Sequence, residues 1–132
     1  MLDAEGNVVA LAGIMQNLTH DFEIVHPLGE IRTVVDYIVE HYHERISIET
    51  LASQAFLSSR QFERRFQSLF RMSPGEFILK VRIDAAARFL IESELSVTQI
   101  AQQCGFYDNS HFTRQFKSKM GISPNQFRKK FS

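Results

Sequence analysis

Apolar residues recur at helical spacing along most of the chain. Just after residue 30 they stand at positions i, i+3, i+4, i+7 and i+11, namely Ile31, Val34, Val35, Ile38 and Tyr42. That spacing is one face of an amphipathic helix. Shorter stripes follow, carrying Ile48, Leu51 and Ala52, then Phe62, Phe66 and Leu69, and later Phe112, Phe116, Met120 and Phe127. The pattern predicts an all-α fold of about seven helices over residues 30–132.

Helix-start signals divide this region further. Ser47 and Asp108 are placed to cap helices, and serine is followed three residues later by Gln or Glu at Ser58/Gln61, Ser73/Glu76, Ser96/Gln99 and Ser123/Gln126. Such pairs form capping boxes, and a proline after two of these serines suits the first helical position. We expect a long helix from Pro74 to about Ser93 and a short one ended by Gly105.

Residues 1–29 have a different character. Residues 3–7 carry turn chemistry, and residues 8–18 are rich in Val, Ile, Leu and Ala, which fits a buried strand. A lone strand is not stable, so we expect either the end of a domain whose body lies outside this sequence or a poorly ordered arm. His26-Pro27-Leu28-Gly29 breaks the pattern and separates a region 1–29 from a domain 30–132.

The second half of that domain repeats the first. Residues 56–80 placed on residues 106–130 give nine identities in 25 positions, including Phe56/Phe106, Phe62/Phe112, Arg64/Arg114, Phe66/Phe116 and Ser73/Ser123. Upstream the offset is 49, so Gly105 is interpreted as one extra residue in the second turn. The repeated unit is a short helix, a tight turn and a longer helix, which is the helix-turn-helix. The sequence therefore predicts two helix-turn-helix subdomains joined by a long linking helix.

Composition and charge narrow the function. The chain is 44% apolar and 23% charged, enough to bury a core. Its single cysteine excludes a disulfide framework, and no run of about 18 apolar residues could span a bilayer. Net charge is zero, but residues 1–29 hold four acidic and no basic residues, whereas residues 107–132 hold six basic and one acidic, or +5. We expect a soluble, cytoplasmic protein with a basic C-terminal end.

A helix-turn-helix binds DNA by laying its second helix in the major groove, with hydrogen-bonding side chains facing outward. On the helix at about 58–71, the residues opposite the Phe stripe are Ser59, Arg60, Glu63, Arg64 and Gln67. On the helix at about 108–120 they are Asn109, Ser110, His111, Arg114 and Lys117. Arginine can bond guanine bidentately, and Arg64 and Arg114 share one phase in the two copies. These residues are the candidate DNA contacts.

The combined motifs resemble the C-terminal DNA-binding domain of AraC/XylS-type bacterial transcription regulators. The similarity is carried by residues 100–106, 110–117 and 121–128, and in the first copy by Leu51-Ala52, Ser58, residues 62–66 and Ser73-Pro74. The resemblance implies that each subdomain inserts one helix into successive major grooves of double-stranded DNA, with RNA polymerase as a further partner. One departure is Arg71, where the family usually has Gly. Either Arg71 takes the left-handed conformation at a cost of about 1 kcal/mol, or the helix ends differently there.

Residues 3–19 resemble the closing β-hairpin of a PAS sensor domain, with Asn17 where such hairpins often have Asp. An edge strand of another sensor domain is the alternative. In both cases we expect the sensing body to lie outside this sequence and the full-length regulator to dimerise through it.

The competing function is a helical protein-interaction module that docks an acidic partner on its basic face. DNA binding weakens steeply with salt and favours one sequence over random duplex, whereas docking shows no such preference. We see no Gly-rich phosphate loop and no spaced catalytic triad, so no enzyme and no cofactor are expected. His41 and His43 should diverge on a helix and share no metal. Cys104 is expected to be a small core residue.

Overall fold

The computed structural model describes residues 29–132, which form seven α-helices and no strand. In chain order these are α2 (Gly29–His41), α3 (Ile48–Gln54), α4 (Ser59–Phe70), α5 (Pro74–Glu92), α6 (Val97–Gln103), α7 (Asn109–Met120) and α8 (Pro124–Phe131). The predicted all-α class is confirmed for this part of the chain. The predicted strand at 8–18 and the PAS-like hairpin lie outside the described residues. None of the seven helices is long and apolar enough to cross a membrane.

The predicted helix starts are confirmed by their capping hydrogen bonds. At the start of α5, the Ser73 hydroxyl accepts from the Glu76 backbone N–H at 3.1 Å, and the Glu76 carboxylate accepts from the Ser73 N–H at 3.0 Å. The same reciprocal pair opens α4, α6 and α8. Each box satisfies two backbone donors that a helix end otherwise leaves unpaired, so each start is fixed by residues three apart in the sequence.

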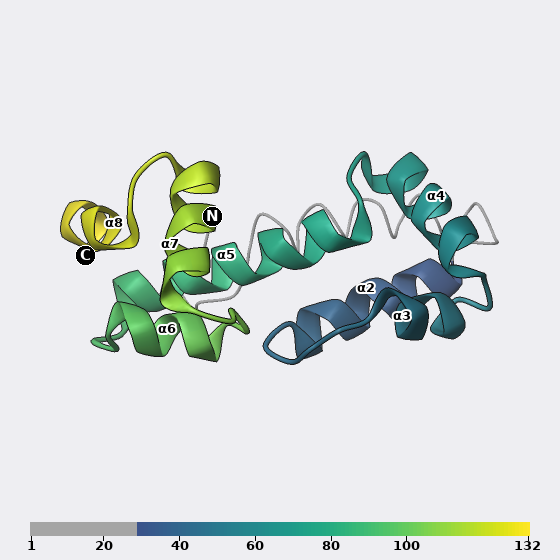
Figure 1. The fold of residues 1–132 in the computed structure, drawn as a ribbon, viewed down its shortest axis with the longest axis horizontal. Helices are drawn as coiled ribbons and strands as arrows, with labels where there is room; N and C mark the ends of the chain where they lie inside the picture. Colours follow the sequence, from purple (N-terminus) through teal and green to yellow (C-terminus); the bar gives the residue numbers. More distant parts are fainter. Residues whose placement is uncertain (1–28) are drawn as a thin grey trace.

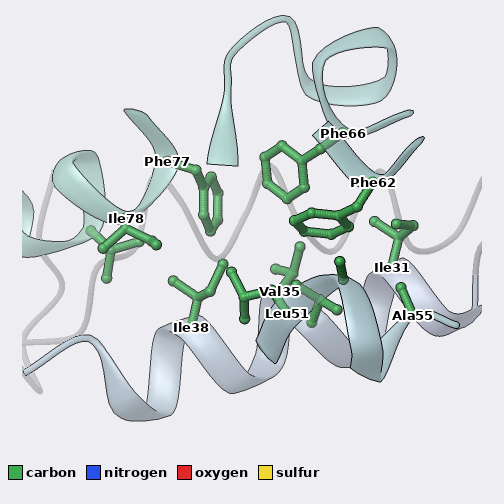
Figure 2. Packing of buried hydrophobic residues seen from close by; sticks show 12 residues of the cluster. Ile31, Val35, Ile38, Leu51, Ala55, Phe62, Phe66, Phe77 and Ile78 are labelled. Carbon is green, nitrogen blue, oxygen red and sulfur yellow. The ribbon is translucent and has the colours of Figure 1, made fainter. Parts of the chain in front are cut away.

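The first hydrophobic core joins α2, α3, α4 and the N-terminal half of α5. Figure 2 shows its aromatic centre, where Phe62, Phe66 and Phe77 point toward the aliphatic side chains of α2 and α3. The ring centroids of Phe62 and Phe66 are 5.7 Å apart, and those of Phe66 and Phe77 are 5.5 Å apart. Phe62 and Phe66 are fully buried, so the rotational setting of α4 is fixed by its own core.

The second core joins the C-terminal half of α5 with α6, α7 and α8, and it repeats the first. Phe112 and Phe116 lie 5.7 Å apart, and Phe116 and Phe127 lie 5.3 Å apart. These three rings stand 50 positions after Phe62, Phe66 and Phe77 in the sequence. The internal repeat is therefore a repeat of packing as well as of residues.

Both cores use α5, but on different stretches of it. Phe77, Ile78 and Val81 belong to the first core, whereas Ile83, Leu90 and the three alanines 85–87 belong to the second. Figure 1 shows α5 crossing the middle of the molecule, with one helix-turn-helix unit at each end. The predicted architecture of two units on a linking helix is confirmed.

The turn between the two helices of each unit corrects the sequence alignment. Phe56 and Gly105 are the left-handed residues of the two turns, with φ of 58° and 86°. The next residue closes each turn: Leu57 N–H donates to Ala52 O and Phe106 N–H to Ala101 O, both at 2.9 Å. The offset therefore stays 49 through Phe106, and the extra residue is Tyr107, not Gly105.

The identity of Phe56 with Phe106 is thus not a structural equivalence. Phe106 packs in the second core and is 6% exposed, whereas Phe56 is 84% exposed. Matching the two copies by residue identity pairs these phenylalanines wrongly, because a phenylalanine can occupy either environment. The hydrogen bonds of the turn, in contrast, can be satisfied in one register only.

A second pair of left-handed residues ends α4 and α7. Arg71 has φ of 60° and Gly121 has φ of 87°, and the N–H of each donates to the carbonyl four residues earlier. Of the two possibilities that the sequence left open at Arg71, the structure shows the left-handed conformation. The first unit thus holds two non-glycine residues in a region that favours glycine.

Replacing Phe56 by glycine should stabilise the protein. The left-handed conformation costs a non-glycine residue about 1–2 kcal/mol. The ring of Phe56 is exposed, so its packing contributes little to stability. Glycine also increases the conformational entropy of the unfolded chain, which offsets about 0.5–1 kcal/mol of this gain. We expect the free energy of unfolding, measured in urea, to rise by about 0.5–1 kcal/mol. In Gly121→Ala, where the added Cβ meets open space, it should fall. A loss in Phe56→Gly would mean that the ring makes a stabilising contact.

Cys104 should be unreactive while the protein is folded. Its side chain is fully buried, and burial raises the pKa of the thiol to about 12, so little thiolate exists at neutral pH. A thiol-specific reagent should therefore modify Cys104 only as fast as the whole protein unfolds, and promptly in denaturant. Rapid modification in native buffer would instead show that the turn after α6 opens locally.

Candidate nucleic-acid interface

The helix α4 presents a charged face opposite its buried aromatic one. Of the predicted contacts on this helix, Arg60, Glu63 and Arg64 are exposed and Ser59 is half-buried. Within residues 29–132, Glu63 forms no ion pair with the arginines beside it. The charged groups of this face are therefore available to an external partner.

The helix α7 presents the corresponding face of the second unit. Asp108 caps its start, with Oδ1 accepting from the His111 backbone N–H at 2.7 Å. Phe112 and Phe116 are fully buried on the opposite side. The exposed predicted contacts are Asn109, Ser110, Arg114 and Lys117. Arg64 and Arg114 thus lie at the same phase of two equivalent helices.

His111 differs from the other predicted contacts because it is half-buried. Its ring packs beside Phe106, with centroids 5.7 Å apart, and its Nδ1 is covered and has no hydrogen-bond partner in the described part of the chain. Only part of the imidazole faces outward, so His111 has less freedom to reach an external group than Arg114 has.

The two candidate helices stand on the same side of α5, as Figure 1 shows for α4 and α7. The linking helix has 19 residues, which corresponds to roughly 28 Å at 1.5 Å per residue. The length of the linking helix is thus comparable with one turn of B-DNA, which is about 34 Å.

A cleft of about 320 Å³ lies between the C-terminal ends of α4 and α7, above α5. Its lining includes three cations and two carboxylates: Arg71, Lys80, Lys119, Glu76 and Asp84. The pattern of the sequence did not indicate that Arg71 and Lys80 contribute to this surface. The replacement of a usual glycine by Arg71 was the available signal.

The carboxylates of the cleft are engaged by the protein. Lys80 Nζ lies 3.6 Å from Asp84 Oδ2, and burial raises the pKa of Asp84. Glu76 belongs to the capping box of α5, and the hydrogen bonds from Ser73 lower its pKa. Within the described residues Arg71 and Lys119 form no direct ion pair, although the charge of Lys119 contributes to lowering the pKa of Glu76.

The basic C-terminal end divides into two kinds of residue. Arg128 is committed to the fold, because its guanidinium donates to the carbonyls of Leu90, Ser93 and Leu95 at 3.1, 3.1 and 2.7 Å. It thereby closes the C-terminal end of α5. Lys129 and Lys130 are exposed. The charge available to a partner is thus smaller than the sequence count of +5.

His41 and His43 do not diverge as predicted. The helix α2 ends at His41, so His43 lies beyond it, and both imidazoles contact Oε2 of Glu44, at 3.2 and 3.4 Å. Among residues 29–132, no three His, Cys, Asp or Glu side chains are grouped so as to hold a metal ion.

Comparison with known proteins places this geometry in a family. A family model described as a helix-turn-helix domain matches residues 51–130, more than half of the chain. An uncharacterised helix-turn-helix-type transcriptional regulator of Haemophilus influenzae is 36% identical over 138 residues, covering 100% of this chain and 46% of that protein. The transcriptional activator RhaS of Escherichia fergusonii is 31% identical over 100 residues, covering 76% and 36%. The chain therefore spans less than half the length of these curated relatives, which are named as regulators and not as enzymes.

Among solved structures, the DNA-binding domain of AdpA, a global transcriptional factor crystallised with a target DNA, matches with a TM-score of 0.74 and 35% identity. The match covers 77% of this chain and 92% of that one, so it takes in both helix-turn-helix units. Repeat, packing and similarity agree: the chain belongs to the AraC-type family of helix-turn-helix DNA-binding domains found in transcription regulators.

Proposed function

We propose that this chain binds double-stranded DNA in a sequence-specific manner by laying α4 and α7 in two successive major grooves. The observation that carries the proposal is the placement of two equivalent polar faces on one side of a linking helix of about one DNA turn in length. The similarity to AdpA, whose structure contains a target DNA, supports it.

Roles within the interface follow from exposure and chemistry. Arg60, Arg64 and Arg114 are exposed guanidinium groups that can read base edges. Ser59, Glu63, Asn109, Ser110 and His111 flank them on the same faces. Lys117, Lys119, Lys129 and Lys130 are exposed ammonium groups suited to phosphates. Arg71 and Lys119 at the cleft would meet the backbone segment between the two grooves.

The longer protein would be a cytoplasmic transcription regulator. The relative RhaS is named a transcriptional activator, which supports a role in activation. RNA polymerase would be the partner that such an activator contacts. Residues 1–29 would connect domain 30–132 to a sensing domain, through which the regulator would dimerise. This chain would then supply the DNA-binding activity alone.

Two matched variants should distinguish residues that read the base sequence from residues that contact phosphates. Arg64→Ala removes a base-reading group, so binding to the cognate site should weaken by about 1–3 kcal/mol with little change on random duplex. Lys117→Ala should weaken binding to both duplexes alike and reduce the salt dependence by about one counterion. Fluorescence anisotropy over a salt series measures both effects. Equal losses on both duplexes for Arg64→Ala would assign Arg64 to a phosphate. An absence of any preference for cognate DNA in the parent protein would favour docking to an acidic partner.

One copy of the chain should bind DNA as a monomer, with its two units contacting two short DNA segments, or boxes, at a fixed spacing. Inserting about 5 bp between the two boxes turns the second box to the opposite face of the duplex. Affinity should then fall to that of a site with a single box, as measured by gel shift at constant salt. A 10-bp insertion is the control for phase, because it restores the face while lengthening the distance by about 34 Å; it should also fail, since α5 cannot stretch. Unchanged affinity after the 5-bp insertion would mean that only one unit engages bases.

A further inference from the structure

The segment after α2 belongs to the first unit but also contacts the second. Tyr42 lies one residue beyond α2 and packs against both hydrophobic cores. Burial raises the pKa of its hydroxyl. Residues 42–45 therefore lie where the two units come together beside α5.

Arg82 ties this segment to the middle of α5. Its Nε donates to the carbonyl of Tyr42 at 2.7 Å, and its Nη2 donates to the carbonyl of Glu44 at 2.8 Å. Arg82 stands between Val81 of the first core and Ile83 of the second. Charge-assisted bonds from a planar guanidinium fix orientation as well as distance, so the segment is held at the junction of the two cores.

Gly105 brings the turn of the second unit directly onto the same segment. A Cβ at this position would lie 2.8 Å from the Tyr42 carbonyl oxygen and 3.0 Å from Arg82 Nε. The left-handed φ of 86° favours glycine at this position, and the close approach requires it. The equivalent Phe56 turn of the first unit is exposed instead.

Tyr107 adds a second contact between the units. It is the extra residue of the second turn, and its hydroxyl accepts a hydrogen bond of 2.5 Å from the Arg45 guanidinium. The Arg45 Cζ also lies 5.6 Å from the centre of the Tyr107 ring. The insertion that distinguishes the two copies thus supplies the side chain that reaches the first unit.

We infer that residues 42–45, Arg82, Gly105 and Tyr107 form an inter-unit bridge that fixes the angle between α4 and α7, and so sets the spacing and phase of the two DNA boxes. A single helix can bend; a second connection beside it prevents the units from swinging about the midpoint of α5. The bridge residues are positioning residues and need not touch DNA. The consequence for DNA rests on the proposed function, whereas the fixed angle does not.

The angle can be measured without DNA. Spin labels at Ser68→Cys and Ser118→Cys occupy equivalent exposed positions on α4 and α7, and buried Cys104 stays unlabelled. Pulsed dipolar spectroscopy should give one narrow distance distribution. Gly105→Ala should shift and broaden it, because the new methyl group displaces the Tyr42 carbonyl.

Two further variants separate positioning from loss of stability. Gly121→Ala imposes the same backbone strain, at φ of 87°, but its Cβ meets open space, so the distance distribution should stay narrow. Tyr107→Ala removes an exposed side chain outside both cores, so the protein should fold while the distribution broadens. Unchanged distributions in both Gly105→Ala and Tyr107→Ala would overturn the bridge.

The DNA readout uses the same variants on a cognate site and on the same site with 1 bp added between the boxes, a rotation of about 35°. The parent should strongly prefer the cognate spacing. Tyr107→Ala should lose about tenfold of that preference while keeping parental affinity for a single box. An unaltered spacing preference would overturn the inference for DNA. If the parent itself binds no cognate DNA, the proposed function fails, and the distance measurement still decides the bridge.

Discussion

The burial of α5 between two separate cores is the constraint on which the rest of the structure depends. Its first half supplies Phe77, Ile78 and Val81 to one core, and its second half supplies Ile83 and Leu90 to the other. A helix that serves two cores is apolar around most of its circumference, unlike a surface helix with one stripe. Neither helix-turn-helix unit has a complete core without it, so the element that separates the two polar faces also stabilises both.

Local features of this fold could be predicted because their causes are local. In each capping box, the serine and the residue it pairs with are three positions apart, and the boxes of Ser58 and Ser73 formed as expected. The phase of Phe62 and Phe66 fixed the outward face of α4, and with it the exposure of Arg64. Helical periodicity therefore predicted both the core and the opposite face of the candidate site.

Contacts between distant segments could not be predicted in this way. Arg128 counted as one more charge of the basic end, but its guanidinium reaches carbonyls 33–38 residues away. Phe56 and Phe106 counted as an identity, although one is exposed and the other buried. His111 was placed on the outward face by phase, while its packing beside Phe106 depends on a turn whose register was misassigned. Only Arg128 depends on partners far along the chain; Phe106 and His111 depend on a turn within five residues, whose register the side-chain pattern does not reveal.

The left-handed positions show how the two copies came to differ physically. Each copy needs one such residue in its turn and one after its longer helix. The first copy holds Phe56 and Arg71 there, at a cost of about 1–2 kcal/mol each, and both side chains project from the surface. The second copy has Gly105, whose neighbour is the Tyr42 carbonyl, and Gly121, which faces open space. A positive φ therefore does not by itself exclude a side chain in this fold. Glycine becomes obligatory only where another backbone lies against the turn. By that criterion, the first turn is free surface and the second is an internal contact between the two units.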